Sequence, residues 1–520
     1  MPIFPLSILA PVILAAVALL ALIWPGRRPK PLPRLAEMAA LYALALTAAG
    51  LLQLLFFTPG SIPAPDRPLG LVLRGDLISA SLALLVSFIG WIVVRYSRSY
   101  LDGEAREGRF HGLMLATLAA VLVFVQAGNL WGLALATIAV GVGLRQLLLF
   151  YPDRPAARRA ATKFALVWHG GDAALLLAVA LLLTTFGTGS LAMLSANAVQ
   201  TGLGLTGHIA IGLLVLAAAL KTAAFPLHGW LTEVMEAPTP VSALLHAGII
   251  NSGGVLLIAT AGLVQLSPGA MTALVVVGGF TALFGAAVML TQSAVKTSLA
   301  WSTVSQMGFL LLQCGLGLWA LALLHIVAHS LYKAHAFLSS GGAVAAVSAI
   351  RRPGPVAVPN LAAVVKSFGL ALGLYAAIAI LFVALFGPKT PQALALGAIL
   401  IFGVAYLVAQ GLADLAPRAL SKRTAIASLG ATLAYFTFQA IAETVWGPAL
   451  PVAPVPGPLE WALIVLAVAS FGLVAFAQAL FTLWAHHPTM AGLRVHIANG
   501  LYLNALLDRM IGGFRTTNAG

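Results

Sequence analysis

Apolar stretches of about 20 residues recur from one end of this chain to the other, separated by short polar segments. A helix of that length crosses the hydrocarbon core of a bilayer. Of the 520 residues, 61% are hydrophobic and 8% are charged, whereas a soluble domain carries about 25% charged residues. The chain lacks the charged residues that would cover a soluble core of this size. The sequence therefore predicts an all-α integral membrane protein.

We expect about fifteen transmembrane helices. The predicted spans are 5–24, 36–57, 77–94, 112–127, 130–151, 164–186, 205–227, 241–264, 271–290, 297–315, 318–347, 361–386, 394–413, 424–445 and 460–485. No basic segment precedes the first apolar run, so we interpret it as a retained span and not as a cleaved signal peptide. The eleventh span is long enough to bend or break near residues 339–342.

Clusters of Arg and Lys test this count, because cytoplasmic loops of membrane proteins are enriched in these residues. With the N-terminus outside, every cluster falls in a cytoplasmic loop: Arg27/Arg28/Lys30/Arg34, Arg95/Arg98/Arg106/Arg109, Arg154/Arg158/Arg159, Arg351/Arg352 and Arg418/Lys422/Arg423. The opposite loop at 448–458 contains neither Lys nor Arg. This parity favours an odd number of spans and a cytoplasmic C-terminus.

The chain divides into four regions on these patterns. Residues 1–110 and 351–490 contain N-terminal and C-terminal transmembrane helices, and 111–350 form the central part. Residues 491–520 are amphipathic and too polar to span, so we expect them at the cytoplasmic interface or against a partner. Cys314 is the single cysteine, which excludes an intrachain disulfide and a Cys-based metal cluster.

Ionisable side chains inside apolar spans are costly and mark candidate functional sites. Asp172 lies in the sixth span, one turn after His169, and Lys221 lies deep in the seventh. His246 follows in the eighth span, and Lys296 begins the tenth. Lys221 is several residues from the end of its span, which argues against simple extension of its amine to the surface. For Asp172 and His246, a structural polar contact is the competing interpretation.

The eleventh span carries His325, His329 and Lys333 at intervals of four residues, which places all three on one helix face. Histidine titrates near neutral pH and suits a proton relay. Metal binding by the two histidines is the alternative, but it lacks a Cys or carboxylate as third ligand. Charges of the later spans lie near predicted helix ends, where a surface position is expected: Lys366, Asp414 and Glu443.

Prolines interrupt the chain between the seventh and eighth spans. Pro226 removes a helical hydrogen bond, and Pro238 and Pro240 precede the eighth span. Irregular backbone at membrane depth is tolerated where it lines a wet cavity. His228 and Glu236 lie in this interrupted segment and join the candidate path for positive charge.

Three long motifs carry a resemblance to a known family. Lys221–Leu231 and Met235–Ala247 together resemble the core motif of the proton-conducting antiporter-like subunits of respiratory complex I and Mrp-type cation/proton antiporters. Ala294–Gly308 and His325–Ala334 resemble the second and third motifs of that family. The resemblance implies five-helix repeats, broken helices at the seventh and at the eleventh to twelfth spans, and a water-linked line of Lys and His. The resemblance also implies that residues 111–350 form the proton-conducting core.

The residues that this resemblance and the polar pattern assign to the proton path are Asp172, His169, Lys221, His228, Glu236, His246, Lys296, His325, His329 and Lys333. The family usually carries a Glu on the fifth span, where Val140 stands in this chain. The usual Glu–Lys pair with Lys221 is therefore expected to be absent. The chain also ends soon after its fifteenth span, without the long lateral helix of the large complex I subunit.

Within the family, the stretches His246–Gly254 and Asn499–Ala505 resemble the DabB membrane subunits of inorganic-carbon accumulation systems. This likeness implies a bacterial inner-membrane location and a DabA-type partner, a large soluble zinc protein similar to a β-carbonic anhydrase, on the cytoplasmic face. The partner would hydrate CO2 to bicarbonate and hold the zinc, with no cofactor in this chain. This chain would supply H⁺ or Na⁺ flow, as a transporter subunit and not an enzyme.

Two alternatives stay open at this point. The chain can instead belong to a respiratory or Mrp-type complex, or it can be a scaffold that anchors an enzyme without conducting ions. Co-purifying partners separate the first alternative from inorganic-carbon uptake, and ion flux separates the second.

Overall fold

The computed structural model describes residues 4–57, 61–62, 70–342, 361–411, 418–484 and 487–510, and most of them are helical. The two short strands are β1 (Ser61–Ile62) and β2 (Gly75–Asp76). The first half contains η1 (Leu6–Ile8), α1 (Leu9–Leu20), α2 (Leu32–Phe56), α3 (Leu77–Tyr100), α4 (Glu107–Val125), α5 (Leu130–Leu148), α6 (Pro155–Phe186), α7 (Leu191–Thr201), α8 (Gly204–Lys221), α9 (Gly229–Thr232) and η2 (Val234–Glu236).

The second half contains the remaining elements of the described chain. They are α10 (Thr239–Ala247), η3 (Ile249–Asn251), α11 (Ser252–Ala259), α12 (Ala261–Val264), α13 (Pro268–Met289), α14 (Val295–Gly315), α15 (Trp319–Ser339), η4 (Ser340–Gly342), α17 (Leu361–Phe386), α18 (Pro391–Gly411), α19 (Arg418–Val445), η5 (Gly447–Ala449), α20 (Pro458–Trp484), α21 (Pro488–Ala498), η6 (Gly500–Tyr502) and α22 (Leu503–Met510).

The all-α fold predicted from the sequence is confirmed, and the protein has multiple membrane spans. Within the described residues, 11 helices are long and apolar enough to cross a membrane. Each predicted span overlaps at least one helix, whereas α7 was not anticipated. The total of fifteen crossings stays a prediction.

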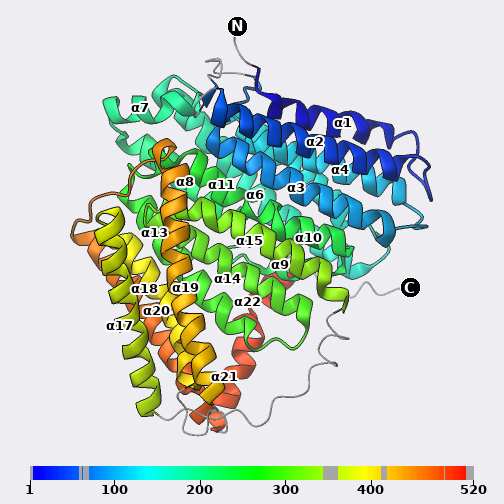
Figure 1. The fold of residues 1–520 in the computed structure, drawn as a ribbon. Coiled ribbons are helices and arrows are strands. Elements are labelled where there is room, and N and C mark those ends of the chain that lie inside the picture. The colour runs from blue at the N-terminus through cyan, green and yellow to red at the C-terminus, as the bar shows by residue number, and fades with distance from the viewer. Residues whose placement is uncertain are drawn as a thin grey trace.

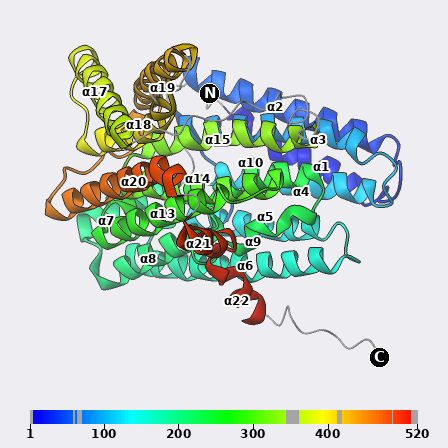
Figure 2. The same ribbon diagram turned by 90° about the horizontal axis from the view of Figure 1, so that it is seen from below.

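Helix α15 runs through the middle of the molecule (Figures 1 and 2). It contacts α3 on the side of the N-terminal helices, α10 and α14 in the core, and α19 in the C-terminal group. The C-terminal helices α17 to α20 form a group of their own beside this core (Figure 1). The polar face of α15 therefore lies where two helix layers meet.

Two interruptions of the helices lie inside the core. Helix α8 ends at Lys221, and the short α9 begins only at Gly229. The predicted eighth span is divided at Gly248, whose backbone angles (φ −123°, ψ −73°) are not helical. The sequence analysis did not anticipate this second interruption. Helix α15 is continuous to Ser339 and passes into the 3-10 turn η4 at Ser340–Gly342, where the sequence predicted a bend or break. The connection to the twelfth span, 343–360, lies outside the described residues.

Helices α13 and α14 pack backbone to backbone through glycine. A Cβ atom on Gly308 would lie 2.4 Å from the amide nitrogen of Ala282, and one on Gly278 would lie 2.5 Å from that of Leu312. Membrane helices associate closely through such small residues, because lipid offers no hydrophobic driving force between them. This contact fixes α14 and its polar side chains against α13.

We predict that Gly278→Ala lowers the melting temperature of the detergent-solubilised protein by several degrees, because the new methyl group meets backbone atoms of α14. The matched control is Gly279→Ala on the same helix, where a Cβ atom would meet nothing within 4 Å. The control is expected to be neutral or slightly stabilising, since alanine favours a helix over glycine by about 1 kcal/mol. Equal thermal shifts in the two variants would contradict this packing.

Candidate functional site

A buried ion pair joins α6 and α8. The Nζ atom of Lys221 lies 2.5 Å from Oδ1 of Asp172, and the Lys221 side chain is 0% exposed. The same amine lies 4.2 Å from the ring centroid of Trp168. His169 extends the pair, with its Nδ1 atom 2.9 Å from Oδ2 of Asp172. Three predicted path residues, Asp172, His169 and Lys221, therefore form one contiguous group.

This pair provides the carboxylate that the fifth span lacks. Val140 on α5 is buried, as expected for an apolar side chain in that position. The sequence analysis expected Lys221 to be without its usual acidic partner from α5. In the structure, Asp172 on the neighbouring helix α6 forms the ion pair instead.

A second group of path residues surrounds the interruption at Gly248. His246 on α10 is 0% exposed, and its Nδ1 atom lies 3.1 Å from Oγ1 of Thr303. The Nε2 atom of His329 on α15 lies 3.0 Å from the backbone oxygen of His246. Because Gly248 interrupts the helix, the short α10 presents His246 to both α14 and α15.

His329 has an oxygen atom next to each ring nitrogen. Its Nδ1 atom lies 2.6 Å from Oε1 of Gln306, opposite the contact of Nε2 with the carbonyl of His246. A neutral imidazole has a single N–H. Both contacts are satisfied by a doubly protonated ring, or by a neutral ring beside a reversed Gln306 amide. The site therefore accommodates two protonation states of His329 without moving the backbone.

The remaining members of the α15 stripe have neutral partners. The Nδ1 atom of His325 lies 2.8 Å from Oε1 of Gln313, and the His325 and His329 ring centroids are 5.9 Å apart. Lys333 is 0% exposed and donates to the backbone oxygen of Leu299 at 3.0 Å. Within the described residues, no carboxylate lies within ion-pair distance of Lys333.

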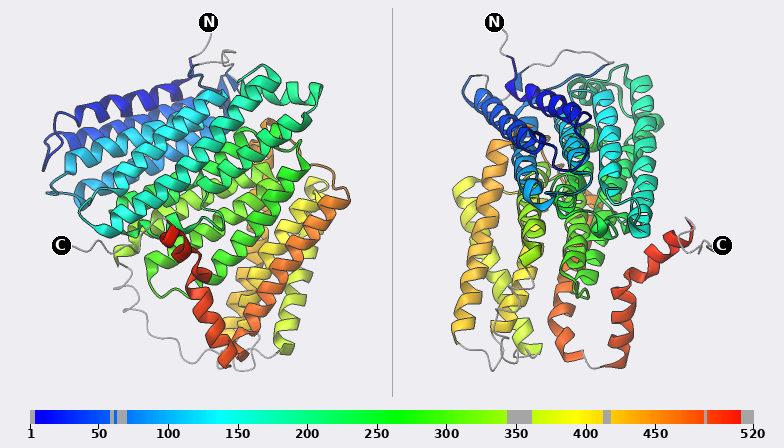
Figure 3. Two further views of the ribbon diagram at one scale, coloured as in Figure 1. Left: turned by 180° about the vertical axis from the view of Figure 1, so that it is seen from behind. Right: turned by 90° about the vertical axis from the view of Figure 1, so that its right-hand side faces the viewer.

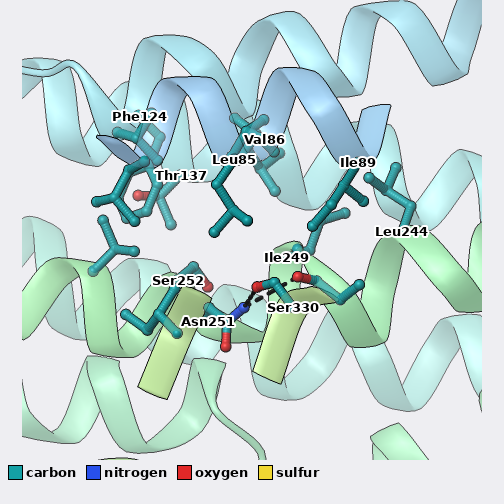
Figure 4. A pocket seen from close by; sticks show the side chains of 18 of the residues that line it. Leu85, Val86, Ile89, Phe124, Thr137, Leu244, Ile249, Asn251, Ser252 and Ser330 are labelled. Carbon is teal, nitrogen blue, oxygen red and sulfur yellow. Dashed lines mark hydrogen bonds between the residues drawn. The ribbon is translucent and has the colours of Figure 1, made fainter. Parts of the chain in front are cut away.

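A small cavity of about 30 Å³ lies beside Trp168 and the interruption at Gly248, and most of its lining is apolar (Figure 4). Trp168 and Thr137 line one side of it, and Asn251 and Ser330 line the other. Asn251 donates to Oγ of Ser330 at 2.9 Å, while its own Oδ1 atom is buried without a partner in the described structure. This volume holds about one water molecule, and a buried amide oxygen provides a polar partner for it.

Other predicted path residues lie farther from these contacts. Lys296 donates to Oγ1 of Thr239 at 3.3 Å, and Glu236 pairs with Arg154 at 3.6 Å at the protein surface. His228 is 1% exposed and packs against aromatic rings. The predicted helix-breaking prolines lie in the same region: Pro226 in the turn after α8, Pro238 at the start of α10 and Pro240 in its first turn.

The structure contains a buried ionic cluster that sequence analysis missed. Lys163 on α6 is 0% exposed and pairs with Glu233 and with Asp508 of α22, the latter at 2.5 Å. Asn504 accepts a hydrogen bond from Lys163 at 2.8 Å and donates to Glu233. The C-terminal segment thus folds back from the end of α20 onto the core (Figure 3). Fully buried charge is rare unless it is paired.

An aromatic cluster separates this ionic cluster from the Lys221–Asp172 pair. Phe164, Trp168 and Trp230 are completely buried and touch one another, with ring centroids 5.2–6.2 Å apart. Phe164 and Trp168 stand between Lys163 and Asp172 in the sequence of α6, and the Trp168 ring also contacts the Lys221 amine.

We predict that Asp508→Ala loosens α22, because Lys163 loses one of its two carboxylate partners and a buried ion pair is costly to break. Hydrogen–deuterium exchange across Leu503–Met510 should increase severalfold. The matched control is Leu506→Ala, since that side chain is 56% exposed on the same helix. Unchanged exchange in the Asp508 variant would show that the pair does not hold the helix.

Residues 127–386, which contain both groups of buried bases, match the NADH:quinone oxidoreductase/Mrp antiporter transmembrane family. The chain belongs to this family. It is an antiporter-like membrane subunit of a cation-transport family, and the resemblance seen in its sequence motifs is confirmed.

The relatives within this family include inorganic-carbon transporter subunits. Probable subunit DabB2 of Halothiobacillus neapolitanus is 39% identical over 88% of this chain and 83% of its own length. Probable subunit DabB of Hydrogenovibrio crunogenus is 47% identical over 50% of this chain and 51% of its own length. NADH-quinone oxidoreductase subunit L of Mycobacterium tuberculosis is 37% identical over 55% of this chain and 46% of its own length.

A solved structure shares the fold. A chain of the Mrp complex from Dietzia sp. superposes with a TM-score of 0.61 at 21% identity, covering 99% of this chain and 60% of that one. At this identity, the likeness concerns the arrangement of the helices alone.

Proposed function

We propose that this chain conducts protons across the membrane. The observation that carries the proposal is the set of deeply buried bases, Lys221, His329 and Lys333, each with a polar contact inside a family of cation-transport subunits. Lysine and histidine take up and release protons, whereas a sodium ion is bound by oxygen atoms and repelled by ammonium groups. The chemistry of the site therefore favours H⁺ over Na⁺.

In this proposal, the proton moves between groups that are already paired. The Lys221–Asp172 pair with His169 forms one station, and His246 with His329 forms the next. Water in the cavity beside Asn251 links the two stations. His325 and Lys333 then extend the path in both directions along α15.

We propose further that the flow powers inorganic-carbon uptake. The support is the DabB2 relative, named as a probable inorganic-carbon transporter subunit, which aligns with 88% of this chain. The partner in this hypothesis is a soluble DabA-type protein on the cytoplasmic face, which holds zinc and hydrates CO2 to bicarbonate. A potential of 100 mV supplies about 2.3 kcal/mol for each charge moved, which would make the hydration directional.

We predict that Lys221→Ala abolishes potential-driven proton flux in proteoliposomes and energised bicarbonate accumulation in cells, because the Asp172 station loses its base. The matched control is Lys366→Ala, since Lys366 is exposed on α17. The control should keep flux and uptake near those of the parent protein. Assembly is checked by size-exclusion chromatography, and full flux in a well-assembled Lys221 variant would refute proton conduction through this residue.

We predict that affinity purification in mild detergent recovers one large soluble protein together with roughly stoichiometric zinc. Mass spectrometry identifies the protein, and metal analysis of the complex measures the zinc. Recovery of many membrane subunits would instead favour a respiratory or Mrp-type complex. A zinc-bearing partner combined with no ion flux in proteoliposomes would favour the non-conducting scaffold.

A further inference from the structure

A second, larger cavity lies between the core and the C-terminal helices. It has a volume of about 500 Å³ and is bounded by α14, α15, α18 and α19. Its polar wall includes His325, His329, Gln306 and Gln313, and Tyr435 lies on the α19 side. The space is large enough for several water molecules beside these polar groups, while the rest of its lining is apolar and it opens toward the protein surface. The two histidines of α15 therefore border this space.

Helix α19 carries a polar stripe that begins at this cavity. Tyr435, Gln439 and Glu443 follow one another at intervals of four residues and share one helix face. Tyr435 lines the cavity, and Gln439 is 0% exposed. The side chain of Gln439 donates to Oε1 of Glu443 at 2.9 Å. The stripe thus leads from the cavity through the apolar C-terminal group to a carboxylate.

The stripe ends at an ion pair at the edge of the protein. Oε2 of Glu443 lies 3.0 Å from Nζ of Lys389, and the two side chains are 44% and 7% exposed. Glu443 lies two residues before the end of α19, whereas the basic residues Arg418 and Lys422 lie at its other end. By the distribution of basic residues, the Glu443 end faces the outside of the cell.

Two buried amides along this route have unused acceptors. Oε1 of Gln439 and Oε1 of Gln392 are buried and have no partner in the described structure. Leaving such a group unpaired costs about 1–3 kcal/mol. The hydroxyl of Tyr435 donates to the carbonyl of Ala393, next to Gln392. Polar atoms of α18 and α19 therefore face each other, and water would satisfy the free amide oxygens.

We infer that the stripe Tyr435–Gln439–Glu443 is the outer half of the proton path. A proton driven inward enters at Glu443, passes along water held by Gln439 and Tyr435, and reaches His325 through the cavity. The inference rests on the proposed proton conduction and adds the route between the buried bases and the outer surface. Glu443, interpreted from sequence as a surface charge, becomes the outer entrance of this route.

The first test measures water access. Cysteines are introduced one at a time at Gln439 and Glu443 in a Cys314→Ala background, which has no other thiol, and a membrane-impermeant thiol reagent is added from outside. We expect fast modification at position 443 and slower but complete modification at position 439. The control position is Ile441 on the same helix, which is 49% exposed and does not line the cavity. It should stay unmodified, because the nucleophile in this reaction is a hydrated thiolate.

The second test measures proton flux in proteoliposomes. We expect Gln439→Leu to reduce flux at least tenfold, because an apolar side chain cannot hold the water, whereas Ile441→Leu should retain it. Gln439→Ser, which is small and polar, should restore much of the flux. Recovery by serine would not occur if Gln439 only stabilised the packing of α18 and α19.

Three outcomes would overturn the inference. The first is full flux in Gln439→Leu. The second is reduced flux in that variant with no thiol modification at position 439, and the third is thiol modification at position 439 with no change in flux in that variant. Each of these would place the route elsewhere. Lys221→Ala, measured in parallel, separates this result from the proposed function. Lost flux in Lys221→Ala with full flux in Gln439→Leu refutes the outer route alone, whereas full flux in Lys221→Ala refutes proton conduction at Lys221 itself.

Discussion

Hydrocarbon solvates charge poorly, and this constraint determines how the protein uses its few buried ionisable side chains. An unpaired charge at the centre of a membrane helix costs about 2.5–3.5 kcal/mol by insertion measurements. Lys221 lies at the end of α8 with its amine against Asp172 and the ring of Trp168, so its charge is compensated inside the protein. The interruption after Lys221 ends the helix where this pair forms. The end of α8 thus coincides with the residue whose amine is paired to Asp172.

The bases of α15 are held differently, and the difference matters for proton transfer. Lys333 and His329 have amide and carbonyl oxygens as partners, and no carboxylate is paired with them in the described structure. A base held by neutral dipoles can change its protonation state without separating an ion pair, whereas deprotonation of Lys221 leaves Asp172 as a buried charge. The Lys221–Asp172 pair is therefore suited to respond to a charge that arrives nearby, whereas the bases of α15 are suited to pass a proton from one to the next.

Local patterns in the sequence predicted the helices and the buried bases, because apolar length and residue spacing depend only on neighbouring residues. Each predicted span overlaps a helix, and the spacing of His325, His329 and Lys333 placed them on one face. Contacts between distant segments were not predictable in this way. Lys163 stands one residue before the predicted sixth span and was not identified from the sequence, because its partner Asp508 lies 345 residues later in the chain. The break at Gly248 was missed for a related reason, since one glycine in an apolar run is compatible with a continuous helix.

The position of Val140 shows how a substitution within a family can be compensated by a neighbouring helix. Motif comparison indicated a missing carboxylate on α5, but Asp172 on α6 supplies the charge from another direction. Val140 then lines the small cavity beside Thr137 and Asn251, where an acidic side chain would have filled the space. In the proposed path, the link from Lys221 toward His246 runs through water in this cavity and not through a side chain at position 140. In that proposal, a single water that leaves or reorients would interrupt proton flow through the core.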